Sequence, residues 1–365
     1  MPPTFTITLP KNATGLTPPS NKGEKLKVDL KKICYPSILK NKNTYKGIII
    51  LNPIIDGFDF GSPVLPKDEK AIKRGLNSIV YKDLEDFKSL SPVDKKKVKQ
   101  ARGYKYSFYW LNGGKLTDQI LLNYVPFKQQ KHFIKVVMQP SRLTQADMEA
   151  FRAFWDSTFT AHPYLKLDNL FQVPKAITRL HVAVDMLNAH VGSFVVTAFA
   201  KKKTGASTKK TTQVTYQNPT GRPETIYLPH DPDSSATEYL YDKKKDMEKK
   251  GKAYPYGEFP MSRFEMRLKP ELAVYKLHKL KNHFKTFNLE VFDHRALKGQ
   301  SHTHTLFTHL ALVRTLEKVT PLVPEKLRKK YMAFFTDNLI PVWRPDDLQK
   351  GLIRDLERLG FIKKE

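Results

Sequence analysis

The sequence predicts an α+β fold, with a mostly antiparallel central β-sheet, packing helices and a helical carboxy-terminal region. Three observations lead to this prediction. Several segments alternate apolar and polar residues with the period of two that is typical of a half-buried strand. Among these segments, residues 144–159 carry an apolar stripe with helical spacing. After Pro270 the alternation gives way to helical periodicity, so we predict one α+β domain over residues 31–270 and a helical region over residues 271–365.

The composition favours a nucleic-acid partner. The 365 residues include 63 Lys and Arg against 36 Asp and Glu, a formal charge of +27, which is more than solubility requires. An anionic membrane surface is the alternative partner. No apolar run reaches the roughly 18 residues of a membrane span and no lipidation motif is present, so we expect no membrane partner. The amino terminus lacks a secretory pattern and Cys34 is the single cysteine, which together predict a cytoplasmic protein.

The amino-terminal part of the chain is predicted to form an arm, a strand and a basic helix. Residues 1–30 are rich in Pro, Thr, Asn and Lys with little periodicity, which indicates an extended basic arm. Residues 45–51 (YKGIIIL) predict a buried strand that the following Asn-Pro step ends. Helical periodicity covers residues 68–102, and the basic run DKKKVKQAR at its end is either a solvated face or a phosphate contact.

A hairpin, a strand and a helix are predicted next. Residues 104–111 and 116–125 alternate around an Asn-Gly-Gly turn, which is the pattern of a hairpin. Residues 131–138 predict a further strand. Thr144 is placed to cap the helix that follows, and Asp147 three residues later forms a variant of the capping box. The apolar stripe of this helix indicates a structural role.

More strands and a lysine-rich segment follow this helix. Residues 178–186 (TRLHVAVDM) and 191–200 predict strands, with shorter ones at 213–217 and 224–228. The lysine-rich residues 201–210 predict a mobile hairpin tip that lies along a phosphate backbone. The cations that we expect to contact DNA are Arg179, Arg267, Lys201, Lys202, Lys203, Lys209 and Lys210.

The carboxy-terminal region is predicted to be helical throughout. Helical periodicity covers residues 271–287, 302–319, 325–336 and 346–359. Three histidines, His302, His304 and His309, open the second of these helices. Two histidines on one strand would indicate a metal site, but the helical context and the missing carboxylate partner favour histidines that face solvent or DNA.

The stretch from 238 to 269 holds most of the candidate functional residues. It contains two predicted strands, and each has one polar face. If these two strands and the strand at 178–186 lie side by side, their polar faces converge. The side chains on this shared face are Arg179, His181 and Asp185 from the first strand, Tyr239, Tyr241 and Lys243 from the second, and Arg263, Glu265 and Arg267 from the third.

A tyrosine beside carboxylates on a basic sheet face suggests phosphodiester transesterification. The phenolate of Tyr241 would attack phosphorus, form a phosphotyrosine and release a 3′-hydroxyl. Free tyrosine has a pKa of about 10, so this attack needs a metal ion or neighbouring cations. Asp185 and Glu265 would hold Mg²⁺ or Mn²⁺, which prefer oxygen ligands. Lys243 and Arg263 would lower the pKa of the phenol or neutralise the phosphorane.

The same residues also have structural explanations, which the sequence leaves open. Tyr239 and Tyr241 can be ordinary strand aromatics, and the two carboxylates can form salt bridges with the neighbouring arginines. Tyr239 shares the face of Tyr241 and is therefore the alternative nucleophile. The sequence has no Gly-rich phosphate loop followed by Lys and Ser or Thr, so we expect no ATPase activity.

Five segments between residues 136 and 269 occur in an order and spacing that together are fairly specific. VMQPSRL looks like a strand-ending FNPxKL segment, and TRLHVAVDM is similar to TRxDxAxD. ETIYL matches the segment before a nick motif, EYLYDKKKD is similar to the nick motif xYIRxYNKKxE, and SRFEMRLK is similar to xRxExRxK. In these segments the chain resembles the plasmid and phage rolling-circle replication initiators of the Rep_trans type.

The resemblance implies roles for individual residues. Tyr241 matches the nucleophilic tyrosine, and Asp185 and Glu265 match acidic positions of the family. Asp246 falls where the nick motif carries a glutamate, which implies a place in the metal site. His181 stands where the family has the first aspartate of its strand motif, so it either joins the metal shell or marks weakened catalysis. The Gly-Ser stretch that usually follows the ETIYL strand is replaced by Pro-His-Asp-Pro at 229–232.

The function implied by the resemblance is the initiation of rolling-circle replication. Such a protein binds a plasmid or phage origin and nicks and rejoins one DNA strand through a phosphotyrosine, as a metal-dependent nickase and strand transferase. Its implied partners are the double-stranded origin, the single-stranded nick site, a second copy of itself and a host helicase. The alternatives are a non-enzymatic, sequence-specific initiator or repressor, which forms no covalent adduct, and an RNA-binding protein.

Overall fold

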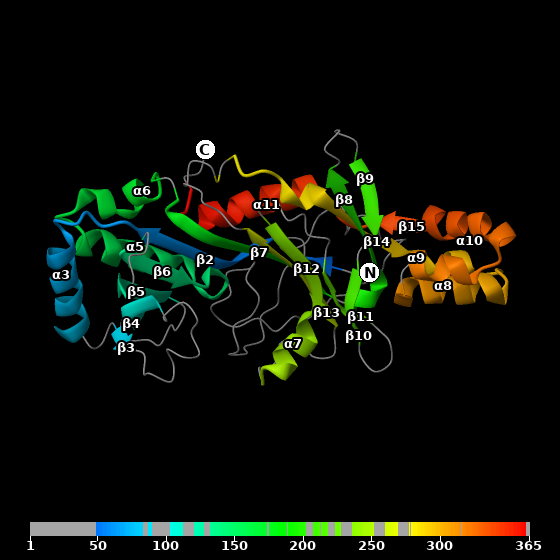
Figure 1. The fold of residues 1–365 in the computed structure, drawn as a ribbon, viewed down its shortest axis with the longest axis horizontal. Coiled ribbons are helices and arrows are strands. Elements are labelled where there is room, and N and C mark those ends of the chain that lie inside the picture. Colours follow the sequence, from blue (N-terminus) through cyan, green and yellow to red (C-terminus); the bar gives the residue numbers. More distant parts are fainter. Residues whose placement is uncertain are drawn as a thin grey trace, which may run out of the picture.

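The computed structural model describes residues 49–82, 87–89, 103–111, 120–127, 132–173, 175–187, 189–201, 207–211, 213–217, 223–227, 236–251, 260–268, 277, 279–314 and 316–362. The predicted arm at 1–30, Cys34, the basic run at 94–102, Lys202 and Lys203 lie outside these residues. The described residues form an 11-stranded sheet, a 4-stranded sheet and helices (Figure 1). Every pair of neighbouring strands whose register is defined is antiparallel, so the predicted α+β class is confirmed.

The large sheet carries the strands that the candidate site needs. Its strands are β1 (Ile49–Ile50), β2 (Ile54–Ser62), β3 (Phe87–Ser89), β4 (Tyr104–Trp110), β5 (Ile120–Pro126), β6 (Ile134–Met138), β7 (Ile177–Leu187), β10 (Gln213–Gln217), β11 (Pro223–Tyr227), β12 (Ala236–Asp242) and β13 (Met261–Leu268). They are ordered β10-β11-β12-β13-β7-β2-β6-β5-β4-β3, and β1 pairs with β7. The three strands of the predicted polar face, β12, β13 and β7, are therefore direct neighbours at the centre of the sheet.

The small sheet contains the lysine-rich segment. Its strands are β8 (Phe194–Lys201), β9 (Ser207–Thr211), β14 (Phe287–Phe292) and β15 (Leu339–Pro341), in the order β15-β14-β8-β9. We expected residues 201–210 to be a mobile tip, but Lys209 and Lys210 are paired with Phe199 and Ala198 across β8 and β9. The backbone at these lysines is thus part of a ladder, on a different sheet from Tyr241.

Helices flank both sheets. They are α3 (Glu69–Lys82), α5 (Gln145–Thr158), α6 (Leu167–Leu170), α7 (Lys243–Lys249), α8 (His302–Arg314), α9 (Leu316–Val319), α10 (Glu325–Asp337) and α11 (Pro345–Arg358). Short 3₁₀ turns lie at η2 (Pro140–Arg142), η3 (Pro163–Leu165), η4 (Val191–Ser193), η6 (His283–Thr286), η7 (His294–Leu297) and η8 (Thr320–Leu322). No helix in the described part of the chain is both long and apolar enough to cross a membrane.

The predicted helix at 144–159 is confirmed as α5. The Thr144 hydroxyl accepts from the backbone N–H of Asp147 at 3.1 Å, and the Asp147 carboxylate accepts from the backbone N–H of Thr144 at 2.9 Å. This reciprocal pair is the capping box that the sequence predicts. Met148, Phe151 and Trp155 are buried in the main core, so the apolar stripe anchors α5.

The predicted division at residue 270 is not a division of the hydrophobic core. In the part of 271–287 that the structure describes, the predicted helix is wrong, because a 3₁₀ turn leads into β14, which pairs with β8. Phe287 lies 4.5 Å from Phe264 of β13, measured between ring centroids. The Asp355 carboxylate of α11 accepts the backbone N–H of Ile55 at 2.8 Å. Both segments therefore complete the core of the large sheet.

The helices α8, α9 and α10, by contrast, form a lobe with its own core at one end of the molecule (Figure 1). His304 of α8 is buried there, its Nδ1 lies 2.9 Å from the Ser301 hydroxyl, and its ring contacts Tyr331. The expectation that His304 faces solvent or DNA is therefore wrong, whereas His302 and His309 are exposed. In the lobe, the predicted helices at 302–319 and 325–336 are confirmed.

Glu238 of β12 makes folding stability depend on pH. Burial raises the pKa of Glu238 to about 7, and the hydrogen bond from Thr286 offsets this only in part. A folded carboxyl with a raised pKa binds more protons than the unfolded one, so its stability is fully present below about pH 4.5 and is lost as the pH rises through 7. Glu238→Gln should remove this loss and raise the free energy of unfolding by about 3 kcal/mol at pH 8, with a much smaller change at pH 5. Urea denaturation at both pH values measures this, and an equal fall in both proteins would contradict it.

Candidate functional site

The register of three strands creates the predicted polar face. Tyr241 of β12 lies opposite Arg263 of β13, which lies opposite Asp185 of β7. Two residues along the strands Tyr239 lies opposite Glu265, and a further two residues along Arg267 lies opposite His181. Because all these pairs fall on alternate residues, their side chains share one face. The predicted convergence of a tyrosine, carboxylates, a histidine and cations is therefore confirmed.

The opposite face of the same strands is core. Leu240, Phe264 and Val184 are fully buried and alternate with the polar residues. The Phe264 ring lies 5.3 Å from that of Trp343, in the segment before α11. A one-residue slip of β13 would bury Glu265 in this core and expose Phe264, so the apolar face fixes the register of the polar one.

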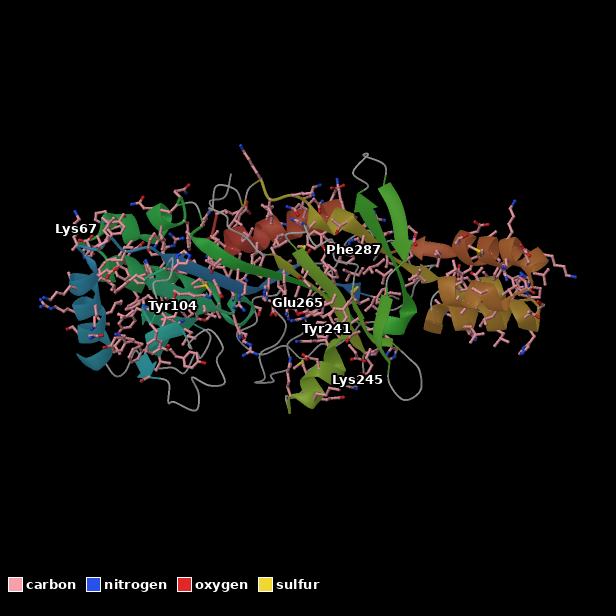
Figure 2. All side chains as sticks on the ribbon, in the orientation of Figure 1. Lys67, Tyr104, Tyr241, Lys245, Glu265 and Phe287 are labelled. Carbon is pink, nitrogen blue, oxygen red and sulfur yellow. The ribbon has the colours of Figure 1, made fainter. Side chains whose placement is uncertain are left out.

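Tyr241 lies between a carboxylate and an ammonium group. Its hydroxyl donates to Glu265 Oε2 at 3.2 Å, and Lys243 Nζ donates to the same hydroxyl at 3.4 Å. Figure 2 places Tyr241 and Glu265 near the middle of the molecule. The hydroxyl of Tyr241 therefore points to the polar side of the sheet, with a proton acceptor and a cation in reach.

Lys243 reaches Tyr241 from a helix and not from the predicted strand. Asp242 ends β12 and caps α7, because its carboxylate accepts the backbone N–H of Lys245 at 3.0 Å. Lys243 is then the first residue of the helix, and its ammonium also donates to Asp246 at 3.3 Å. The predicted proximity of Lys243 to Tyr241 holds, although the predicted local structure was wrong.

The protonation states of this group follow from burial. Burial raises the pKa of Tyr241 well above its ordinary value; Arg263 counteracts the rise and Glu265 adds to it. Burial, together with Arg263, lowers the pKa of Lys243. The phenol is therefore protonated at neutral pH, and Glu265, its hydrogen-bond acceptor, is placed to take the proton in a reaction at Tyr241.

Arg263 is held by two aspartates beneath Tyr241. Its Nε and Nη2 donate to the two carboxylate oxygens of Asp185 at 2.6 and 2.7 Å, and Nη1 lies 3.5 Å from Asp56 of β2. Arg263 and Asp185 are each only 2% exposed. Burial alone would raise the pKa of Asp56, but Arg263 and a hydrogen bond from Ser141 at 2.8 Å hold it below its ordinary value. Arg263 is thus a fixed charge beside Tyr241 and not an exposed phosphate ligand.

The four predicted metal ligands do not gather into one group. Asp185 is engaged by Arg263, and Asp246 is paired with Lys243 and with Lys250. Within the described ranges no three His, Cys, Asp or Glu side chains lie where they could jointly hold a metal ion. His181 Nδ1 and Glu265 Oε1 do come within 3.9 Å of each other. Burial and two arginines lower the pKa of His181 to about 3, so its imidazole is neutral and able to bind a metal.

The predicted DNA contacts have different surroundings. Arg179 donates to Asp59 at 2.9 Å and is part of an ion-pair cluster on β2 and β7. Arg267 is half exposed, with its guanidinium 4.8 Å from the Tyr239 ring. Lys201, Lys209 and Lys210 lie on β8 and β9. Arg267 thus joins the surface around Tyr241.

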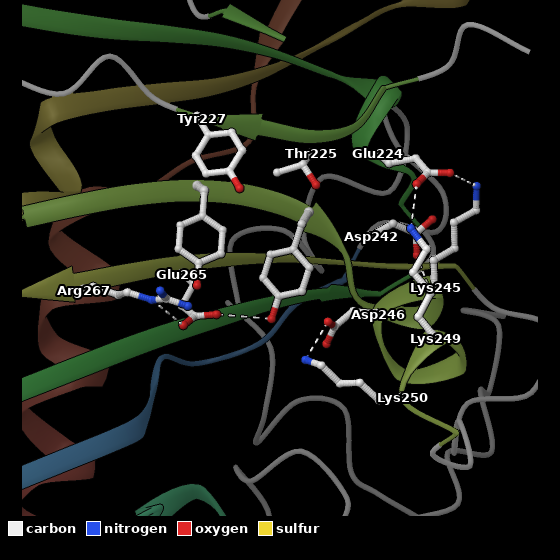
Figure 3. Close-up of a pocket in the computed structure, with 12 residues that line it drawn as sticks. Glu224, Thr225, Tyr227, Asp242, Lys245, Asp246, Lys249, Lys250, Glu265 and Arg267 are labelled. Atoms are coloured by element: carbon white, nitrogen blue, oxygen red, sulfur yellow. Dashed lines mark hydrogen bonds and ion pairs between the residues drawn. The ribbon is translucent and has the colours of Figure 1, made fainter. Parts of the chain in front are cut away.

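A pocket of about 260 Å³ opens over this face between the strands and α7 (Figure 3). Its wall includes Tyr239, Tyr241, Glu265 and Arg267 on one side. Six further lining residues were not singled out from the sequence. Thr225 and Tyr227 of β11 stand beside Tyr241 and Tyr239, and Glu224, Lys245, Lys249 and Lys250 line the rest of the pocket. The run DKKKDMEKK contains the signal for the lysines, because residues four apart share one face of a helix. The site at 238–269 thus includes α7 and is extended by β11.

The lysines of α7 are anchored but accessible. Lys245 and Lys249 both pair with Glu224 of β11, at 2.6 and 3.3 Å, and Lys250 pairs with Asp246. Ion pairs near the surface contribute little stability. A scan against protein-family models and a search of curated proteins found no match for the chain.

Proposed function

We propose that this protein initiates rolling-circle replication of a plasmid or phage, by nicking and rejoining one DNA strand through a phosphotyrosine at Tyr241. The observation that carries the proposal is the hydrogen bond from Tyr241 to Glu265 at 3.2 Å, with Lys243 on the other side of the hydroxyl. The charge of +27 and the lysines of α7 supply attraction for a polyanion.

The proposed reaction uses this chain's own side chains in sequence. Glu265 Oε2 takes the proton of Tyr241, and the phenolate oxygen attacks the phosphorus. The ammonium of Lys243 and the fixed charge of Arg263 stabilise the negative charge that develops. The bond from phosphorus to the 3′ oxygen breaks, and that oxygen takes a proton from water. Rejoining is the reverse, with the 3′-hydroxyl attacking the phosphotyrosine and Glu265 returning the proton.

The site offers a divalent ion two protein ligands. Mg²⁺ and Mn²⁺ use one or two protein ligands together with water and substrate phosphate oxygens, and Glu265 and neutral His181 would be these ligands. The ion, when bound, polarises the phosphoryl group and lowers the barrier to attack. The further proposed partners follow from the resemblance: duplex origin DNA, the single-stranded nick site, a second copy of the chain and a host helicase. We place this activity in the cytoplasm, without a membrane partner.

A non-enzymatic, sequence-specific DNA-binding initiator or repressor is the second candidate. The raised pKa of Tyr241 and the buried pairing of Asp185 with Arg263 favour it, because both remove features that a nickase uses. The two candidates differ in covalent chemistry alone. A binder retards DNA and leaves the phosphodiester backbone whole.

Incubation of the full chain with supercoiled plasmids carrying random inserts, in the presence of Mn²⁺, separates the two candidates. A nickase converts part of the plasmid pool to open circles and forms a protein–DNA adduct that resists detergent. Peptide mass spectrometry should place the nucleotide on Tyr241, and a chelator added beforehand should suppress the adduct. Retardation without open circles or adduct would reject the nickase and support the binder.

A further inference from the structure

Three tyrosine rings form a continuous stack across β11 and β12. The centroids of Tyr227 and Tyr239 lie 5.9 Å apart, those of Tyr239 and Tyr241 lie 5.5 Å apart, and both pairs are inclined by 29°. Tyr227 and Tyr239 are direct cross-strand partners, and Tyr241 is the next residue on the same face. The guanidinium of Arg267 lies over Tyr239, so the stack has a cation at its side.

The stack leads from the reactive hydroxyl to the surface. The side chain of Tyr241, at one end of the stack, is partly buried, whereas that of Tyr227, at the other end, is 42% exposed. All three rings line the same pocket, and Figure 3 shows Tyr227 at its edge, on β11. Cross-strand aromatic pairs stabilise sheets, which explains the pairing of Tyr227 with Tyr239. Tyr227 nevertheless leaves much of its ring exposed at the edge of a charged pocket, where the flat group of a ligand can reach it.

The chemistry of this edge matches an unpaired nucleotide. Proteins that bind single strands combine aromatic rings, on which bases stack, with cations that follow the phosphates. Here Tyr227 and Arg267 offer the flat surfaces, and Lys245 and Lys249 of α7 stand on the opposite wall of the pocket. Because every base has a π face, stacking of this kind does not require a particular sequence.

We propose that Tyr227, backed by Tyr239 and Arg267, is a stacking site for an unpaired base of single-stranded DNA beside the phosphate that Tyr241 attacks. The identity of the strand and its attachment to Tyr241 rest on the proposed function. The stack itself does not, because it holds a base whether or not the backbone is cut. Double-stranded DNA, whose bases are already stacked, gains nothing from this site.

Two variants of Tyr227 test the stacking site in the full chain. Tyr227→Leu keeps apolar bulk without an aromatic face, and Tyr227→Phe keeps the ring without the hydroxyl. We expect the leucine variant to bind a fluorescently labelled oligothymidine about tenfold more weakly than wild type, and the phenylalanine variant to bind it as wild type does. Affinity for a labelled duplex should be equal in all three proteins. Thermal unfolding shows that each variant is folded.

A second readout observes the base directly. An oligonucleotide with one 2-aminopurine should lose fluorescence on binding wild type or Tyr227→Phe, and should stay bright on Tyr227→Leu. Equal single-strand affinity of wild type and Tyr227→Leu, or an equal loss on single strand and duplex, would overturn the stacking site. If the plasmid assay yields no nicks while the leucine variant still loses single-strand affinity alone, the stacking site stands and the nickase falls.

Discussion

Replacing Tyr241 by phenylalanine should abolish the covalent adduct and lower strand cleavage by about a thousandfold or more. The substitution removes the oxygen that donates to Glu265 at 3.2 Å and keeps the ring that stacks on Tyr239. DNA binding should therefore persist while the chemistry disappears. The measurement is the fraction of supercoiled plasmid converted to open circles, together with the detergent-resistant adduct.

Tyr239→Phe is the matched control for this variant. Tyr239 lies on the same face of β12, in the same pocket, and also stands beside Glu265. Its pKa is raised by burial, with Glu265 adding to the rise, and Lys243 donates to Tyr241 and not to Tyr239. We expect Tyr239→Phe to keep most of the cleavage activity. Loss of the adduct in Tyr239→Phe alone would assign the nucleophile to Tyr239 instead.

The sequence predicted the polar face because that face depends on a period of two. Tyr241, Arg263 and Asp185 fall on alternate positions of segments whose other residues are apolar, and burial of the apolar set decides which way each strand turns. Once β12, β13 and β7 pair, the polar side chains must meet. The local alternation of residues thus predicts this part of the site, and the loops that join the strands need not be known.

Contacts between distant segments of the chain, by contrast, cannot be predicted from local sequence patterns. Asp56 reaches Arg263 from β2, and nothing near Asp56 in the sequence marks it as a partner of the site. Asp355 accepts from Ile55 across 300 residues, which places a predicted separate helix in the main core. The alternation of side chains continues through Lys243, so the sequence predicts that it belongs to the strand. In the structure the side chain of Asp242 caps a helix, and Lys243 is the first residue of that helix. In each case one tertiary contact or one capping hydrogen bond outweighs the local propensity and periodicity of the segment.

Removing the carboxylate of Asp185 should cost about 3 to 5 kcal/mol of folding free energy. Asp185→Ala leaves the guanidinium of Arg263, only 2% exposed, with Asp56 at 3.5 Å as its remaining acid. A buried cation that loses its two-pronged carboxylate partner is costly, because water cannot reach it to replace those hydrogen bonds. Urea denaturation of the variant measures the loss. The double variant Asp185→Ala with Arg263→Met should recover part of it, since the buried guanidinium is then gone and only Asp56 lacks its cation.

The exposed pair of Arg152 and Asp168 provides the matched control, because it has the same chemistry without burial. Asp168→Ala should cost less than about 1 kcal/mol. The comparison also bears on the role of Asp185. A carboxylate whose main partner is a divalent ion repels its neighbouring acids in the metal-free protein, and its removal leaves stability unchanged or raises it. If Asp185→Ala is as stable as Asp168→Ala, Asp185 does not neutralise Arg263 and its assignment as a metal ligand regains support.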